Sequence, residues 1–177
     1  MIILGIDPGY AIVGFGVIEA VGQNFRMITY GAVTTQPDTD FPERLKEIYH
    51  DVGSIIDIYN PDAIAIEQLF FHTNQKTVIK VGQARGVVLL AAAEKNKPIF
   101  EYTPLQVKQA VVGYGRAEKK QVMELTRNFL HLDKVPKPDD AADALAVAVC
   151  HAHTATSLMP TAGNLRSLRL KTLDNLK

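Results

Sequence analysis

Two short apolar runs that each end in an acidic residue constrain the fold more than any other feature. Ile2–Ile6 ends at Asp7, and Ala63–Ile66 ends at Glu67. The second run is apolar at every position, which is typical of a central strand buried on both faces of a parallel sheet. Between them, Phe41–Tyr59 has apolar residues at helical spacing and is long enough for a right-handed crossover. The two strands are therefore predicted to be adjacent and parallel, with both carboxylates at one sheet edge.

Further segments extend this sheet and add helices. Ile12–Glu19 and Phe25–Thr35, joined by a hairpin connection at Val21–Asn24, are predicted to form an antiparallel meander with the first run. Gly14 in the second run indicates a close backbone approach or a bulge. A fifth strand is predicted at Pro98–Tyr102. Further helices are predicted over Thr73–Glu94, Pro104–Val112, Glu118–Leu130, and Pro138 to about His153.

The composition indicates one globular domain. Hydrophobic residues make up 47% of the 177 residues and charged residues 21%, which excludes a disordered chain. Strands and helices alternate, so we expect an α/β domain over residues 1–155 and a C-terminal tail over residues 156–177. Apolar runs such as Val87–Ala93 are far shorter than the roughly 20 residues that cross a bilayer. The single cysteine, Cys150, fits a small core residue, and no basic leader precedes the first strand. We expect a cytoplasmic protein.

The charges are distributed unevenly along a chain whose formal net charge is zero. Residues 1–70 contain three basic and ten acidic side chains, whereas residues 71–177 contain sixteen basic and nine acidic ones. Such asymmetry is typical of a protein with one face suited to a polyanion. Chance variation over a mixed surface is the alternative explanation.

A second pair of acids opens a helix near the end of the predicted domain. Asp140 and Asp143 are three residues apart, so they share a helix face. The segment from Asp140 to Val149 is otherwise apolar on every side, as in a buried helix. A buried aspartate is costly unless it is paired or binds a metal. Favourable placement near a helix N-terminus explains Asp139 and Asp140 better than it explains Asp143.

The four acids together indicate more than each does alone. Singly, Asp7 can cap the turn at Pro8-Gly9, and Glu67 can simply reach solvent. With Asp140 and Asp143 they form a set of oxygen ligands suited to Mg²⁺ or Mn²⁺. Two such ions about 3.5–4 Å apart stabilise both the attacking water and the leaving 3′ oxygen in phosphodiester hydrolysis. No Ser/His/Asp or Cys/His set competes, so the sequence predicts a metal-dependent nuclease.

Aromatic and basic residues near these acids are candidate nucleic-acid contacts. The pair Phe70-Phe71 follows Glu67 and can stack on unpaired bases, although one or both rings can instead return to the core. For any single lysine, a solvated surface position is the alternative to a phosphate contact. The basic candidates are Lys76, Lys80, Arg85, Lys108, Arg116, Lys119 and Lys120.

A series of motifs across roughly residues 1–155 closely resembles the RuvC family of bacterial Holliday-junction resolvases. Their order and combination make them specific as a set. They are Gly5-Ile-Asp7-Pro-Gly9, Ala65-Ile-Glu67-Gln68, Val81-Gly-Gln-Ala-Arg85-Gly86, Gln106-Val-Lys108-Gln, Ala117-Glu-Lys119 and Asp140-Ala-Ala-Asp143-Ala-Leu.

This resemblance implies an RNase H-like fold, with a five-stranded mixed sheet flanked by helices. It implies a homodimer in which each subunit nicks one of two symmetry-related strands of a four-way DNA junction, in homologous recombination and DNA repair. It also implies two Mg²⁺ ions per subunit, for which Mn²⁺ can substitute, and branch-migration partners of the RuvA and RuvB type. Gly82 and Gly86, one helical turn apart, would permit close helix contact across a dimer interface.

The resemblance also implies roles for particular residues. By motif, the metal ligands and catalytic acids are Asp7, Glu67, Asp140 and Asp143. The doublet at 139–140 leaves either aspartate as the third ligand, and some family members carry histidine there. Phe70 matches the aromatic that stacks at the junction, with Phe71 as the other candidate, while Lys108 and Lys119 match basic residues that approach the scissile DNA.

Two other classes share part of this pattern. The run from Gly5 to Gly9 is similar to the first phosphate loop of actin-like ATPases and sugar kinases, but the chain is too short for their two domains and shows no second phosphate loop. A non-catalytic junction-binding module of the same fold is the other alternative. None of the four carboxylates is missing, which favours the enzyme.

Overall fold

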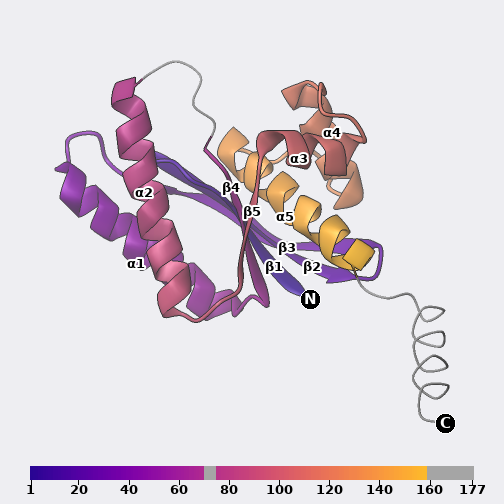
Figure 1. Cartoon of the computed structure of the whole chain (residues 1–177), viewed down its shortest axis with the longest axis horizontal. Helices are drawn as coiled ribbons and strands as arrows, with labels where there is room; N and C mark the ends of the chain where they lie inside the picture. Colours follow the sequence, from indigo (N-terminus) through magenta and orange to yellow (C-terminus); the bar gives the residue numbers. More distant parts are fainter. Residues whose placement is uncertain (70–74, 159–177) are drawn as a thin grey trace, which may run out of the picture.

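The computed structural model describes residues 1–69 and 75–158 and contains one five-stranded sheet of order β3-β2-β1-β4-β5 (Figure 1). The first three strands form an antiparallel meander, and β4 and β5 run parallel to β1. This is the mixed sheet that the sequence predicts. The strands are β1 (Ile2–Asp7), β2 (Ile12–Val21), β3 (Asn24–Thr34), β4 (Ala63–Glu67) and β5 (Ile99–Tyr102).

Helices cover both faces of the sheet (Figure 1). Helices α1 and α2 pack together on one face, whereas α5 lies on the other face with α3 and α4 packed against it. No described helix is both long and apolar enough to cross a bilayer. The helices are α1 (Phe41–Tyr59), α2 (Gln75–Glu94), α3 (Pro104–Val112), α4 (Lys119–Phe129) and α5 (Asp139–Leu158).

The last helix is longer than the sequence predicts. The residue pattern predicts an end near His153, but α5 continues to Leu158. No glycine or proline interrupts this stretch, and the Thr154 hydroxyl donates to the carbonyl of Cys150 at 2.9 Å, a bond that a threonine can make within a helix. The apolar pattern of α5 therefore ends several residues before the helix itself does.

Helix α5 lies directly on the sheet because two strand glycines leave room for its backbone. A Cβ atom on Gly5 would lie 2.0 Å from the carbonyl oxygen of Ala144. A Cβ atom on Gly14 would lie 2.0 Å from the carbonyl oxygen of Asp140. Both distances are far below contact distance, so these positions require glycine. The close approach that Gly14 predicts is confirmed, and it brings the start of α5 over the end of β1 and the start of β2.

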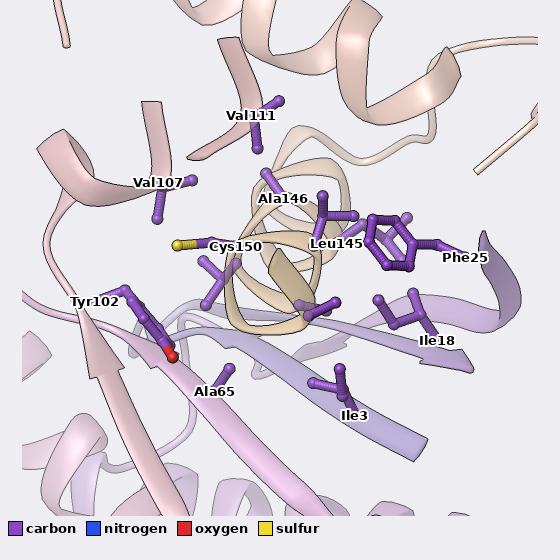
Figure 2. Packing of buried hydrophobic residues seen from close by; sticks show 14 of the residues in the cluster. Ile3, Ile18, Phe25, Ala65, Tyr102, Val107, Val111, Leu145, Ala146 and Cys150 are labelled. Atoms are coloured by element: carbon purple, nitrogen blue, oxygen red, sulfur yellow. The ribbon is translucent and has the colours of Figure 1, made fainter. Parts of the chain in front are cut away.

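The core on this side surrounds α5 (Figure 2). Cys150 is buried there as a free thiol, as the sequence predicts. Small alanine side chains along α5 allow the helix to contact strands and helices at short range. Leu145 of α5 is buried in this core, and residues that pack around the helix include Ile3, Ile18, Phe25, Ala65, Tyr102, Val107 and Val111 (Figure 2).

The opposite core lies between the sheet and helices α1 and α2. In α1, Ile48, Val52 and Ile56 repeat every four residues and are buried. Arg44 occupies the preceding position of this repeat and is buried as well. A Cβ atom on Gly82 or Gly86 in α2 would meet no atom within 4 Å, so the described chain itself makes no close contact at either glycine.

Candidate active site

The first two acids meet at the sheet edge where β1 and β4 end. The strands are parallel, and Ile6 is paired with Ile66, so Asp7 and Glu67 are adjacent at their C-terminal ends. The crossover through α1 accounts for this arrangement, as the sequence predicts. The crevice beyond the C-terminal ends of parallel strands is a usual ligand site.

The second pair of acids comes from the last helix of the described sequence, far along the chain from Asp7. Asp140 and Asp143 lie in the first two turns of α5, which the contact at Gly14 holds against the sheet. The charge of Asp143 raises the pKa of both Asp7 and Glu67, and that of Asp140 raises the pKa of Asp7. All four predicted acids therefore belong to one electrostatic cluster.

Burial and mutual repulsion shift the pKa values of these acids upward. Burial is the largest cause of the pKa of about 8 at Asp7, and repulsion by Glu67 is the next. Burial also raises the pKa of Glu67 to about 7, with Asp143 adding to the shift. A hydrogen bond with Asp7 opposes the shift at Glu67, as do the charges of Lys119 and Lys108. Buried acids that repel one another favour a bound cation.

Lys119 supplies positive charge to this cluster. Its Nζ donates to Asp143 Oδ2 at 2.7 Å and lies 3.9 Å from Asp139 Oδ2. Burial lowers the pKa of Lys119, but the hydrogen bond and charge of Asp143 outweigh it, and the net shift is upward. At Asp143, burial raises the pKa and remains dominant over Lys119. Lys119 is therefore a fully charged neighbour of the carboxylates.

The two members of the aspartate doublet have different surroundings. Asp139 Oδ1 accepts a hydrogen bond from Lys137 Nζ at 2.6 Å, and this bond is the largest cause of its lowered pKa. Its side chain is 47% exposed. Asp140 instead belongs to the group of charges that act on Asp7.

A cavity of about 280 Å³ opens beside these carboxylates. Glu67 and Asp143 line it from the sheet and from α5. Lys108 on α3 and Lys119 on α4 line it from the other side, so both basic residues that the resemblance singles out lie at the site. Apolar side chains, including Val107 and Val122, form the rest of its wall.

The other predicted DNA contacts are scattered. Arg85 forms an ion pair with Glu101 at 2.7 Å, and its side chain is only 19% exposed. Lys80 is exposed and lies over the rings of Tyr10 and Phe41, with Nζ 5.7 and 5.5 Å from their centroids. Arg116 and Lys120 are exposed near the start of α4. Phe70, Phe71 and the side chain of Lys76 lie outside the described residues.

The donor set fits a hard divalent cation, although the side chains do not form a closed cage. Among the described residues, no three His, Cys, Asp or Glu side chains are grouped as a metal site as they stand. The Lys119 ammonium instead occupies one oxygen of Asp143. Carboxylates whose pKa values are raised by burial and by mutual repulsion are nonetheless the ligands that Mg²⁺ favours.

Arg44 contacts the turn that follows Asp7, although the sequence pattern places it only among the basic side chains of residues 1–70. The available signal is its spacing, since Arg44 lies four residues before Ile48 on the apolar stripe of α1. Its side chain reaches the turn that follows Asp7, where Nη2 donates to the carbonyl of Tyr10 at 3.1 Å. A buried arginine that holds the turn after the first acid is therefore the residue that hydrophobic patterns miss.

Comparison with known proteins identifies the family. Residues 3–151 match the family profile described as crossover junction endodeoxyribonuclease RuvC. The chain belongs to the RuvC family. The RuvC of Alkaliphilus oremlandii is 62% identical over 154 residues, which cover 87% of this chain and 94% of that protein.

Solved RuvC structures agree with this assignment. The Thermus thermophilus RuvC structure superposes with a TM-score of 0.82 at 39% identity, covering 88% of this chain and 95% of that one. T. thermophilus RuvC in complex with Holliday junction substrate gives a TM-score of 0.82 at 36% identity, covering 89% and 97%. The expected RNase H-like fold is confirmed, and the phosphate-loop ATPase alternative is set aside.

RuvC membership also determines the enzyme class. The chain is a crossover junction endodeoxyribonuclease, and nucleases of this family depend on metal ions.

Proposed function

We propose that this RuvC-family chain resolves four-way DNA junctions by paired symmetric nicks, with Asp7, Glu67, Asp140 and Asp143 as the metal-binding acids. The observation that carries this proposal is the gathering of all four carboxylates into one cluster with raised pKa values at Asp7, Glu67 and Asp143. Such a cluster, beside a cavity lined by two lysines, fits a phosphodiester held next to divalent cations.

Each acid has a distinct part in this scheme. Asp7 and Glu67 are the central ligands because they are adjacent at the ends of parallel strands. Asp143 would complete the coordination from α5. Asp140 would hold or orient the second ion or the water, and its effect on Asp7 favours it over Asp139, which is engaged with Lys137. Two Mg²⁺ ions per subunit, or Mn²⁺ in their place, would activate water and stabilise the leaving 3′ oxygen.

Lysines at the cavity hold the DNA strand. In the free protein Lys119 donates to Asp143. A DNA phosphate competes for the same ammonium, and its arrival releases the Asp143 carboxylate toward the metal site. Lys108 faces the same cavity from α3 and stabilises the negatively charged backbone. Phe70 or Phe71, which follow Glu67 in the sequence, stacks on bases at the junction. Lys76, Lys80, Arg85, Arg116 and Lys120 are proposed as further DNA contacts.

Paired nicks require two active sites, so we propose a homodimer. The complex of T. thermophilus RuvC with a Holliday junction supports the choice of substrate. Branch-migration proteins of the RuvA and RuvB type would deliver the junction, in the cytoplasm of a bacterium. Residues 1–155 form the catalytic domain in this proposal, and residues 156–177 are a tail.

Cleavage of a labelled mobile four-way junction, compared with its linear duplex arm, tests the proposal. With Mg²⁺ we expect paired symmetric nicks in the junction alone, and none with EDTA. Equal cutting of both DNAs would leave a nuclease without junction specificity. Binding without cutting, across several sequences and with Mn²⁺ as well, would favour a non-catalytic module.

A matched variant tests the assignment of the acids. Asp7→Asn keeps the size of the side chain and one oxygen but removes the negative charge. We expect this variant to bind the junction and to lose cleavage. Turnover comparable to wild type would refute the role of Asp7.

A further inference from the structure

The turn between β1 and β2 follows Asp7 directly, and an internal arginine holds it. Thr35 Oγ1 donates to the carbonyl oxygen of Tyr10 at 2.8 Å. Arg44 Nη2 donates to the same oxygen at 3.1 Å, while Arg44 Nε donates to Thr35 Oγ1 at 2.8 Å. The three groups close a ring of hydrogen bonds around one backbone carbonyl. We refer to Arg44 and Thr35 as the turn clamp.

The side chain at the tip of this turn is held as well. The Arg44 guanidinium carbon lies 5.0 Å from the centroid of the Tyr10 ring, within the range of a cation–π contact. Phe41 meets the same ring edge to face, with centroids 6.1 Å apart. The backbone of Thr35 also donates to the carbonyl of Ala11 at 3.0 Å. The turn therefore has anchors at its main chain and at its side chain.

Burial of Arg44 is energetically unusual. Its relative exposure is 7%, as is that of Thr35. Within the described ranges, no carboxylate lies at ion-pair distance from its guanidinium; its partners there are Thr35, the Tyr10 carbonyl and the Tyr10 ring. A buried cation without an acidic partner is costly, and an apolar side chain of similar volume would cost less. Arg44 is therefore better explained by the geometry that it imposes than by stability alone.

We propose that Arg44, with Thr35, is a positioning residue for Asp7: the turn clamp fixes the Asp7–Tyr10 turn and thereby the direction of the Asp7 carboxylate toward the metal site. The inference rests on the proposed role of Asp7 as a metal ligand. Asp7 is the last residue of β1, so its main chain is held by strand pairing on one side and by the clamped turn on the other. A carboxylate that must share ions with Glu67 and Asp143 tolerates little displacement.

The test compares Arg44→Met with wild type in two measurements. The first is Mn²⁺ binding to the DNA-free dimer or monomer as purified, by calorimetry. The second is single-turnover cleavage of saturating junction over a range of Mg²⁺ concentrations. Methionine keeps most of the packing volume but removes the charge and the donors. We expect weaker Mn²⁺ binding and a cleavage rate lower by about ten- to a hundred-fold, partly restored by more Mg²⁺, because small misplacements of catalytic groups have effects of this size.

Further variants separate positioning from folding. Arg44→Lys keeps one donor and should recover part of the loss, and Thr35→Ser should behave as wild type. Thr35→Val should lower both measurements in the same direction as Arg44→Met. The double variant should lose less than the product of the two single losses, since the two side chains belong to one hydrogen-bond network. Arg26→Met, which removes an exposed arginine paired with Glu19, is the matched control and should change neither measurement.

Each outcome decides between the proposals. Junction affinity in EDTA should stay within about two-fold of wild type for every folded variant. Wild-type Mn²⁺ binding and cleavage in folded Arg44→Met, or independent multiplicative losses in the double variant, would overturn the clamp. If Arg44→Met does not fold, Thr35→Val and Arg44→Lys carry the same comparison. Asp7→Asn in parallel tells the failures apart, because an active Asp7→Asn would overturn the metal-site assignment itself.

Discussion

Replacing Asp7 with asparagine should stabilise the metal-free protein at neutral pH, although it removes activity. Burial and repulsion raise the pKa of Asp7 from 3.8 to about 8. The folded protein therefore binds more protons than the unfolded chain between these two values. By linkage, the free energy of unfolding falls as pH rises through this window and levels off above pH 8.

The size of the effect follows from the shift. One pKa unit corresponds to about 1.4 kcal/mol, so at pH 7, which lies between 3.8 and about 8, Asp7 costs the fold about 4 kcal/mol. At pH 5 the cost is only about 2 kcal/mol by the same reasoning. The asparagine of the variant does not titrate in this range. The difference in unfolding free energy between variant and wild type should therefore grow by about 2–3 kcal/mol from pH 5 to pH 7.

Urea unfolding in EDTA at a fixed protein concentration, repeated from pH 5 to pH 9, measures this difference. Asp139→Asn is the control: the pKa of Asp139 is lowered, so its contribution is already complete above pH 5 and should not change across the window. Adding Mg²⁺ should stabilise wild type more as pH rises, because the metal binds the ionised acids. A stability difference between variant and wild type that is independent of pH, or one that shrinks from pH 5 to pH 7, would refute the reasoning.

Three other predictions concern neighbouring features. Gly14→Ala should lower the free energy of unfolding by at least about 3 kcal/mol, because a Cβ there would lie 2.0 Å from the backbone of helix α5. As a control, Gly53→Ala should raise the free energy of unfolding by about 0.5–1 kcal/mol, because the nearest atom to its Cβ is 4.0 Å away. Thermal or urea unfolding measures both. Asp140→Asn should abolish junction cleavage while Asp139→Asn retains it, and the opposite result in a gel assay would transfer the ligand role to Asp139. Lys119→Met should bind Mn²⁺ more tightly without DNA, because the Asp143 carboxylate is freed, yet it should cleave the junction more slowly. Weaker Mn²⁺ binding than wild type, measured by calorimetry, would contradict this.

The sheet and its carboxylate edge can be predicted because the relevant signals are local. An apolar run that ends in an acid marks a strand and its terminus, and the intervening helix determines that β1 and β4 are parallel neighbours. The approach of α5 is also partly visible in the sequence, since Gly14 in a strand indicates close backbone contact. The residue pattern alone therefore predicts that Asp7 and Glu67 lie together.

Partners of charged side chains cannot be predicted in the same way. Nothing near Arg85 in the chain indicates that Glu101, on β5, is its partner. Lys119 is expected to face DNA, but its bond to Asp143 depends on how α4 packs against α5. The burial of Arg44 is not predicted, because analysis of hydrophobic periodicity assigns every arginine to the surface. Such pairings depend on distances between elements, which the spacing of residues along the chain does not contain.

The site draws its acids from both the first strand and the last described helix, and this has a consequence for synthesis of the enzyme. While the chain is being made, Asp7 is present long before α5 has formed. A nascent chain, or one truncated before α5, therefore has two of the four carboxylates and lacks the helix that covers the glycines of β1 and β2. Under the proposed assignment of the acids, nuclease activity requires the finished domain, and a chain truncated before α5 is expected not to cut DNA.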